Sequence, residues 1–91
     1  MSNKNSTLVS IIMPTYNHGH FIGRALSSVI KQTYKNWELF VIDNFSDDNT
    51  QKVMSEFNDP RINYLRVNNF GVIATSRNIG IRKARGKWIA F

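Results

Sequence analysis

The sequence predicts an α/β protein in which helices cover both faces of a parallel sheet, a three-layer α/β/α arrangement. Short apolar runs alternate along the chain with segments whose apolar residues recur at helical spacing, which predicts the element order β-α-β-α-β-α-β. The run at residues 39–42 is apolar without polar alternation, as in a strand that is buried on both faces. Strands in this order pair in parallel through right-handed crossovers.

The first strand and the first helix follow from residue type and spacing. Residues 9–13 are largely β-branched, and Pro14 ends the strand because proline cannot donate to a sheet ladder. Asn17 is predicted to cap the helix that follows. From Ile22 onward, apolar residues recur at the i, i+3, i+4, i+7 and i+8 positions, so this helix should bury one stripe and end near Thr33.

The middle of the chain predicts two more strands and a second helix. A strand is expected over 37–43, then a helix over 50–57 with Asp48 and Gln51 as a reciprocal N-cap pair. Apolar and polar residues alternate over 62–67, which predicts a strand with one wetter face at an edge of the sheet.

The last part of the chain predicts a third helix and a fourth strand. The helix is expected over 73–84, with Gly86 in the left-handed conformation just after its end. The strand is expected over 88–91, and Trp88 is assigned to the core. Because the chain stops within this apolar strand, we expect it to be truncated at its C-terminal end.

Length and composition limit the classes of function. The 91 residues allow one domain, which we divide into a polar leader at 1–8 and a folded part at 9–91. No apolar run approaches the roughly 18 residues of a membrane span. The absence of cysteine excludes disulfides and thiolate metal sites.

The formal net charge of +6 raises the alternative of nucleic-acid binding. Five of the twelve Lys and Arg residues lie at positions 77–87, on the predicted third helix and its exit. A solvated helix face, a phosphate-facing role for one or two members and a nucleic-acid groove stay open for this cluster. His18 and His20 have a spacing that a metal site could use, but no third ligand is near in sequence, so a surface position is expected.

Polar residues that follow the predicted strand at 37–43 form the candidate site, because ligands of parallel α/β sheets bind at the carboxyl ends of the strands. Asp43 and Asn44 stand at that end. Asp43 either orients Asn44 or bonds loop amides, and both roles stay open.

Three stretches together resemble the family 2 glycosyltransferases, which have the GT-A fold, a Rossmann-like architecture that binds nucleotide sugars. Val9-Ser-Ile-Ile-Met-Pro-Thr-Tyr-Asn17 is similar to the family's opening strand and its Pro-Thr/Ser-Tyr-Asn end. Val41-Ile-Asp-Asn-Phe-Ser-Asp-Asp-Asn-Thr50 is similar to its Asp-Asp/Asn-x-Ser-x-Asp-x-Thr loop. Ser76-Arg-Asn-Ile-Gly80, with Ala84-Arg-Gly-Lys-Trp-Ile-Ala-Phe91, is similar to its Arg-Asn-x-Gly helix and the next strand. The chain thus resembles the N-terminal, nucleotide-binding portion of the family.

The resemblance implies a set of nucleotide-binding residues, namely Pro14, Thr15, Tyr16, Asp43, Asn44, Arg77 and Asn78. Thr15 and Tyr16 match positions that contact the base and ribose of the donor, although the residue types alone also fit a turn threonine and a half-buried tyrosine. Asn44 matches a position where many relatives carry an aspartate that accepts the uracil N–H. An amide can accept that bond or donate to a ring carbonyl, so uridine, thymidine and guanosine donors stay open.

The third helix contributes the remaining two residues of this set. The resemblance implies that Arg77 faces the base or a diphosphate oxygen, with a surface arginine as the alternative. For Asn78 a structural role is expected, in which its side chain bonds loop backbone near Asp43, whereas the resemblance implies a position near the site.

The resemblance also implies an activity, the inverting transfer of a sugar from a nucleotide-diphosphate-sugar donor to a hydroxyl of a saccharide or glycolipid, in polysaccharide biosynthesis. A divalent cation, Mg²⁺ or Mn²⁺, would be held by an Asp-x-Asp-type motif in the loop after the last strand, and a later carboxylate would be the catalytic base. We therefore expect no catalytic residue and no metal ligand among these 91 residues, and at most nucleotide binding without turnover.

Location and partners follow from the same resemblance. It implies a cytoplasmic protein, peripheral to the inner face of the membrane in its full-length form, with no nucleic-acid partner. The exposed edge of a truncated sheet is expected to favour homo-oligomers. Two other classes stay open: a small basic nucleic-acid-binding module, and another Rossmann-like nucleotide-binding fragment such as a nucleotidyltransferase. The sequence has neither a Gly-x-Gly-x-x-Gly turn nor a Walker-type loop, which counts against the second of these classes.

Overall fold

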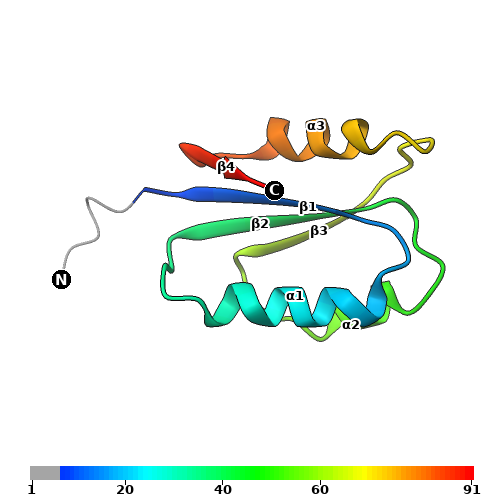
Figure 1. The fold of residues 1–91 in the computed structure, drawn as a ribbon, viewed down its shortest axis with the longest axis horizontal. Helices are drawn as coiled ribbons and strands as arrows, with labels where there is room; N and C mark the ends of the chain where they lie inside the picture. Colours follow the sequence, from blue (N-terminus) through cyan, green and yellow to red (C-terminus); the bar gives the residue numbers. More distant parts are fainter. Residues whose placement is uncertain (1–6) are drawn as a thin grey trace.

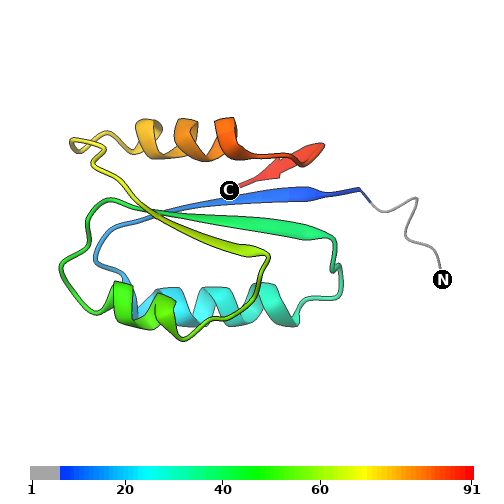
Figure 2. The ribbon, with the colours of Figure 1, turned by 180° about the vertical axis from the view of Figure 1, so that it is seen from behind.

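The computed structural model of the protein describes residues 7–91, so most of the predicted leader at 1–8 lies outside the described residues. In chain order the elements are β1 (Val9–Thr15), α1 (Gly19–Lys31), β2 (Trp37–Asp43), α2 (Thr50–Ser55), β3 (Ile62–Arg66), α3 (Ile73–Lys83) and β4 (Trp88–Ala90). All four strands pair in parallel, in the order β3-β2-β1-β4. Helices α1 and α2 cover one face of the sheet and α3 covers the other (Figures 1 and 2), which confirms the predicted fold class and element order.

Strand β2 is the centre of the core and is buried along its whole length. Leu39 and Val41 pack in one hydrophobic cluster with Leu26 of α1. Phe40 and Ile42 belong to a second cluster, which includes residues of β1 and α3. The unbroken apolar run therefore marks a strand covered on both faces, as predicted.

The first three strands end level with one another. Thr15, the last residue of β1, is the register partner of Asp43, the last residue of β2, and Asp43 is also the partner of Arg66 in β3. Strand β1 runs two residues past its predicted end and includes Pro14. This is tolerated because β4 pairs only with Val9–Ile11 among the described residues, which leaves the β1 edge at Pro14 free of a second ladder.

Helix α3 lies very close to β1 at Gly80. A Cβ atom on Gly80 would lie 2.5 Å from Cγ2 of Ile12, which is fully buried. Carbon atoms in contact normally stay about 3.5–4.0 Å apart. Glycine at this position therefore allows α3 to pack closely against the sheet. This packing positions the first turn of α3 next to the loops at the carboxyl ends of the strands.

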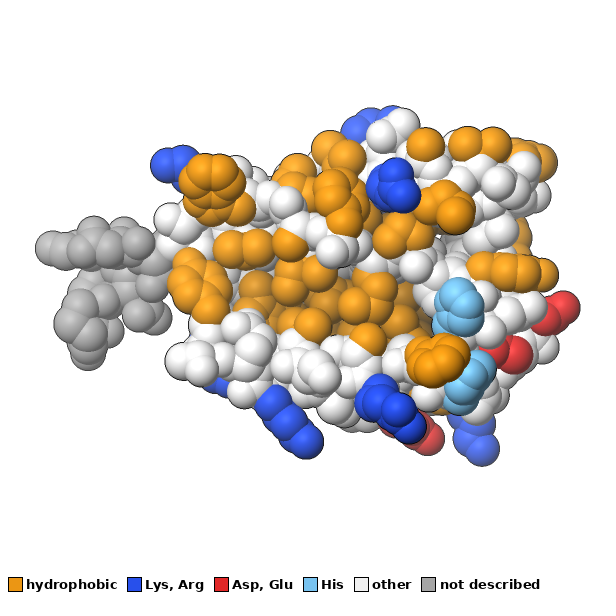
Figure 3. Space-filling model, in the orientation of Figure 1, with side chains coloured by type: hydrophobic (Ala, Val, Ile, Leu, Met, Phe, Trp, Pro, Cys, Tyr) orange, Lys and Arg blue, Asp and Glu red, His pale blue; other side chains and the backbone are white. Residues whose placement is uncertain are grey.

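Strand β4 forms an edge of the sheet, and its side chains are exposed. Trp88 is 62% exposed, so its assignment to the core is wrong, because the described elements cover neither the outer edge nor the outer face of this short strand. Hydrophobic side chains also gather between α3 and α1 on the face shown in Figure 3. Met13, Phe21 and Ala25 help to line a groove on the α1 side of β1. Self-association through this edge stays a prediction.

A buried carboxylate, Glu38 of β2, ties the exit of α3 to the sheet. The Ser10 hydroxyl donates to Glu38 Oε2 at 2.6 Å, the Arg85 backbone N–H donates to the same oxygen at 2.7 Å, and the Arg85 guanidinium donates to Oε1 at 2.9 Å. The Gly86 N–H donates to Ser10 Oγ at 2.8 Å. The prediction of a left-handed Gly86 is wrong, since its φ is not positive. Glycine is needed there for a close approach, because a Cβ would lie 2.6 Å from Ser10 Oγ.

This clamp makes the stability of the protein depend on pH. Burial alone raises the pKa of Glu38, but the hydrogen bonds from Ser10 and Arg85 outweigh it and hold the pKa below its ordinary value. The unfolded chain therefore takes up the proton more readily than the folded chain. The stabilisation by Glu38 is complete above about pH 4.3, the ordinary pKa of glutamate, and is lost as the pH falls through the lower folded pKa.

We expect the difference in unfolding free energy between the protein and its Glu38→Gln variant to shrink as the pH falls from 7 to 3, because a protonated Glu38 is chemically close to glutamine. Urea denaturation at each pH, followed by far-UV circular dichroism, measures the difference. A difference that stays constant over this range would show that the charge of Glu38 does not stabilise the fold.

Candidate functional site

A cleft opens at the carboxyl ends of the strands, where the β1–α1, β2–α2 and β3–α3 loops meet. Its volume is about 540 Å³, and its lining consists of Tyr16, His18, Asn44, Asn69, Gly71 and Ile73. A smaller pocket of about 140 Å³ shares part of this lining and adds Pro14 and Thr15. Ligand sites commonly measure about 300–1,000 Å³, and in parallel α/β sheets they lie at this edge.

The structure brings some of the predicted site residues together and leaves others apart. Pro14, Thr15, Tyr16 and Asn44 lie in the lining of the cleft and its smaller pocket. Asp43 is fully buried and lies next to the lining without joining it. The other two residues, Arg77 and Asn78, are exposed on α3. The guanidinium of Arg77 lies 6.0 Å from the ring centre of Phe91.

Thr15 carries a buried polar atom that the described residues leave unsatisfied. The residue is 7% exposed, and its Oγ1 has no hydrogen-bond partner within residues 7–91. The backbone is held in place, since the Thr15 carbonyl accepts the Asn44 N–H at 3.0 Å. A buried hydroxyl without a partner costs about 1–3 kcal/mol, and a polar ligand atom in the adjoining pocket would recover part of that cost.

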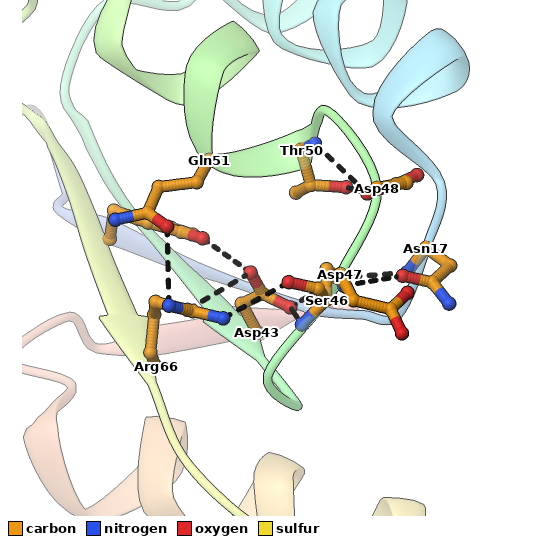
Figure 4. A network of polar contacts seen from close by, with 9 residues as sticks. Asn17, Asp43, Ser46, Asp47, Asp48, Thr50, Gln51 and Arg66 are labelled. Carbon is orange, nitrogen blue, oxygen red and sulfur yellow. Dashed lines mark hydrogen bonds and ion pairs between the residues drawn. The ribbon is translucent and has the colours of Figure 1, made fainter.

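Asp43 holds the β2–α2 loop in place (Figure 4). Its Oδ1 accepts the Ser46 N–H at 2.9 Å and the Ser46 hydroxyl, and its Oδ2 accepts the Tyr64 hydroxyl. Arg66 Nε lies 3.9 Å from Oδ2, and the same guanidinium donates to the Ser46 carbonyl at 3.0 Å. The sequence left two roles open for Asp43, orienting Asn44 or bonding loop amides. These contacts show the second role.

Tyr64 belongs to this network as a donor. Burial is the main cause that raises the pKa of Tyr64, and the hydrogen bond to Asp43 raises it further. The phenol therefore stays protonated at neutral pH and keeps donating to Asp43.

Asn17 joins the β1–α1 loop to the β2–α2 loop. Its φ is +51°, its Oδ1 accepts the Asp47 N–H at 2.9 Å, and its own N–H donates to Ser46 Oγ at 2.8 Å. The prediction that Asn17 caps α1 is wrong, since the N-cap residue is His18. The Asn17 side chain is occupied by a loop that is 30 residues away in the sequence.

Asp48 connects the first turns of α1 and α2. Its Oδ1 accepts the Thr50 N–H at 2.9 Å and the Thr50 hydroxyl, and its Oδ2 accepts the Gly19 N–H at 3.1 Å. The bond from the Thr50 hydroxyl is the main cause that lowers the pKa of Asp48. The predicted reciprocal cap with Gln51 is wrong, because Gln51 Oε1 instead accepts a bond from Arg66 at 3.2 Å.

Asn69 is a site residue that sequence reasoning missed. Its N–H donates to Asn44 Oδ1 at 3.0 Å, its Nδ2 donates to Ser76 Oγ at 3.0 Å, and its Oδ1 accepts the Gly71 N–H at 2.9 Å. A turn pattern does not distinguish this buried asparagine from its exposed neighbour Asn68. His18 and Ile73 were also missed as lining residues, although the position of His18 directly after the Pro-Thr-Tyr-Asn motif was a usable signal.

The described residues include no cluster of metal ligands. Within residues 7–91, no three His, Asp or Glu side chains are grouped so that they could hold an ion. None of the helices in this part of the chain has the length and apolar character needed to cross a membrane.

Comparisons with known proteins give the family. The model of the family described as Glycosyl transferase family 2 matches residues 10–91. The UDP-Glc:alpha-D-GlcNAc-diphosphoundecaprenol beta-1,3-glucosyltransferase WfgD of Escherichia coli is 50% identical over 84 residues, which cover 92% of this chain and 33% of that protein. The putative teichuronic acid biosynthesis glycosyltransferase TuaG of Bacillus subtilis is 31% identical over 86 residues, which cover 92% of this chain and 34% of that protein.

Solved glycosyltransferase structures share the fold. TarS 1-349 of S. aureus superposes with a TM-score of 0.81 and 28% identity, over 89% of this chain and 25% of that one. The mannosyltransferase PcManGT from Pyrobaculum calidifontis, solved in complex with GDP-Man and Mn2+, gives a TM-score of 0.75 and 27% identity over the same shares.

The chain spans about a third of the length of these two curated relatives. The family match nevertheless extends from the second residue of β1 through β4 and includes every loop of the cleft. The sequence resemblance is thus confirmed, and the chain belongs to glycosyl transferase family 2.

Proposed function

We propose that the protein containing this chain transfers a sugar from a nucleotide-diphosphate-sugar donor to an acceptor hydroxyl, and that the cleft binds the nucleotide. The acceptor oxygen attacks C1 of the sugar with inversion, and the bond from C1 to the phosphate oxygen breaks. The nucleoside diphosphate leaves, and a general base takes the hydroxyl proton. The described residues provide the nucleotide-binding part of this reaction.

The buried, unsatisfied hydroxyl of Thr15 is the observation that carries the nucleotide proposal. It adjoins a cleft whose lining includes the ring of Tyr16, which is 51% exposed. A hydroxyl beside an accessible aromatic ring suits a base, which presents both polar edge atoms and a flat face. In this proposal Pro14 shapes the turn and Asp43 supports the loop that presents Asn44.

Helix α3 begins at the same edge of the sheet, where Ile73 lines the cleft, and Arg77 lies in its second turn. We propose that Arg77 reaches a diphosphate oxygen and that Asn78 lies close to the bound donor, since both side chains are exposed on this helix. Arg85, one of the five basic residues at positions 77–87, forms an ion pair with Glu38 within the fold. Together with the family assignment, this favours the transferase proposal over a nucleic-acid-binding module.

The donor, acceptor and location are proposed from the relatives. The name of WfgD includes UDP-Glc and a diphosphoundecaprenol-linked acceptor, and PcManGT was solved with GDP-Man and Mn2+. We accordingly propose a uridine or guanosine donor, a saccharide or lipid-linked saccharide acceptor, and a place in the cytoplasm at the inner face of the membrane. A divalent cation would neutralise the departing diphosphate in the whole enzyme.

Replacing Thr15 with valine tests the nucleotide site. Valine has nearly the same shape, so stability should be unchanged or higher once the unsatisfied hydroxyl is removed. The affinity for UDP should fall by about tenfold, since one hydrogen bond to the nucleotide is lost. Amide NMR titration measures the affinity, and the signals of Tyr16 and Asn44 should shift while that of Glu38 at the other end of the sheet stays in place.

Thr33→Val is the matched control, because Thr33 is exposed beyond the C-terminal end of α1, away from the cleft. It should leave UDP affinity unchanged. Equal UDP affinity for Thr15→Val and the original protein would contradict the assigned role of Thr15, and a spectrum that UDP does not shift at all would contradict nucleotide binding by this chain.

A further inference from the structure

The side-chain amide of Asn44 has only one orientation that satisfies its contact with the β3–α3 loop. The Asn69 backbone N–H points at Asn44 at 3.0 Å, and a backbone N–H only donates. The Asn44 atom that faces it must therefore be the oxygen Oδ1. The Nδ2 group, with its two N–H donors, occupies the other branch of the amide.

Both partners in this contact are held firmly. The Asn44 N–H donates to the Thr15 carbonyl at 3.0 Å, which fixes the backbone of Asn44. Asn69 is held by bonds to Ser76 Oγ and to the Gly71 N–H, and Ser76 is fully buried. A flip of the Asn44 amide would place two donors face to face and leave the buried Asn69 N–H without an acceptor, which disfavours the flipped orientation.

Asn44 is partly exposed and lies in the cleft lining with Tyr16 and His18. Within residues 7–91, Asn44 Nδ2 donates to no acceptor, whereas Oδ1 already accepts one bond. The uncommitted branch of the Asn44 amide is therefore a hydrogen-bond donor, whereas Oδ1 keeps a second lone pair but is turned toward Asn69.

We propose that Asn44 recognises the base of the nucleotide by donating from Nδ2 to a carbonyl oxygen of the base, and not by accepting a ring N–H. This inference rests on the proposed nucleotide site and adds the polarity of its base recognition. Uracil, thymine and guanine carry such a carbonyl, and adenine carries none. An aspartate at this position would offer only acceptors and would select a ring N–H instead.

Asn44→Asp tests the proposal, because the two modes of recognition predict opposite results. The new carboxylate still accepts the Asn69 N–H, so the loop contact is kept. Its second oxygen replaces the donor and would face the base carbonyl, acceptor against acceptor. UDP should therefore bind about tenfold more weakly or worse, as measured by amide NMR titration.

Asn68→Asp is the matched control for the added negative charge, because it places the same charge in a loop that borders the cleft. Asn68 is exposed in the same loop as Asn69, and its Oδ1 accepts the Phe70 N–H at 2.8 Å, a bond that aspartate keeps. The tenfold loss is expected for Asn44→Asp relative to this control. Circular dichroism of both variants verifies that they are folded.

Each outcome of the titration decides the question. Weaker UDP binding by Asn44→Asp than by Asn68→Asp supports donation to a carbonyl. Equal or tighter binding overturns the inference, because it means that position 44 accepts a ring N–H or does not touch the base, while the nucleotide site itself stands. UDP that shifts no signal of the original protein overturns both the nucleotide site and the inference.

Discussion

Replacing Asp43 with alanine is expected to lower the free energy of unfolding by about 3–5 kcal/mol, a large part of the roughly 5–15 kcal/mol that stabilises a domain. Asp43 is fully buried and accepts bonds from the Ser46 N–H, the Ser46 hydroxyl and the Tyr64 hydroxyl. Alanine leaves these donors without their acceptor. It also removes the negative charge that lies 3.9 Å from Arg66.

The loss should be visible at the cleft as well as in stability. The loop that Asp43 holds also carries Asn44, so UDP affinity should fall even under conditions where the variant remains folded. Urea denaturation followed by the fluorescence of the buried Trp37 gives the free energy, and NMR titration gives the affinity.

Asp43→Asn is the control for this substitution. Asparagine keeps the size of the side chain and one acceptor for Ser46, and its Nδ2 can donate to the Tyr64 oxygen. It should cost only about 1–2 kcal/mol. An alanine variant as stable as the asparagine variant would show that the loop finds other partners and that the network does not hold it.

Gly80→Ala is expected to destabilise the protein by about 1–3 kcal/mol, although alanine is intrinsically better than glycine in a helix by about 1 kcal/mol. The new Cβ would lie 2.5 Å from Ile12 Cγ2 and 2.9 Å from Ile12 Cδ1. Ile12 is fully buried between the sheet and α3 and has no room to withdraw. Helix α3 must then lift from β1, which also displaces Ile73 at the cleft. Thermal and urea denaturation measure the change.

Gly23→Ala provides a control of opposite sign. In α1 a Cβ on Gly23 would meet only Val53 Cγ1, at 3.4 Å, so the helix preference should prevail and raise stability by up to about 1 kcal/mol. Combining Gly80→Ala with Ile12→Ala should remove the clash, so that Gly80→Ala costs little in that background. A Gly80→Ala cost that is unchanged by Ile12→Ala would mean that contact with Ile12 is not its cause.

Local patterns predicted the fold well because they reflect burial and chain direction. The apolar run at 39–42 predicted a strand covered on both faces, and β2 spans the expected residues, Trp37–Asp43. The same patterns failed at helix starts. Asn17 and Gln51 have side chains that suit caps, but they bond to Asp47 and Arg66, which local patterning does not reveal.

The candidate site was predictable in part for a related reason. Motif resemblance and strand ends pointed to Thr15, Tyr16 and Asn44, which line the cleft or its smaller pocket. Asn69 and Ile73 come from the β3–α3 loop and the start of α3, and they reach the cleft because α3 crosses to the other face of the sheet. No residue type in that segment marks this position.

The sequence by itself determined the α/β class, the order of the elements and the family, because hydrophobic periodicity and motif spacing are properties of short segments. The tertiary structure alone decided which atoms of those motifs are available to a ligand. Asp43 and Asn44 are adjacent in the chain, yet Tyr64 and Ser46 occupy the carboxylate while Asn69 takes only the oxygen of the amide. Their difference arises because neighbouring residues at a strand end point to opposite faces of the sheet and meet different partners there.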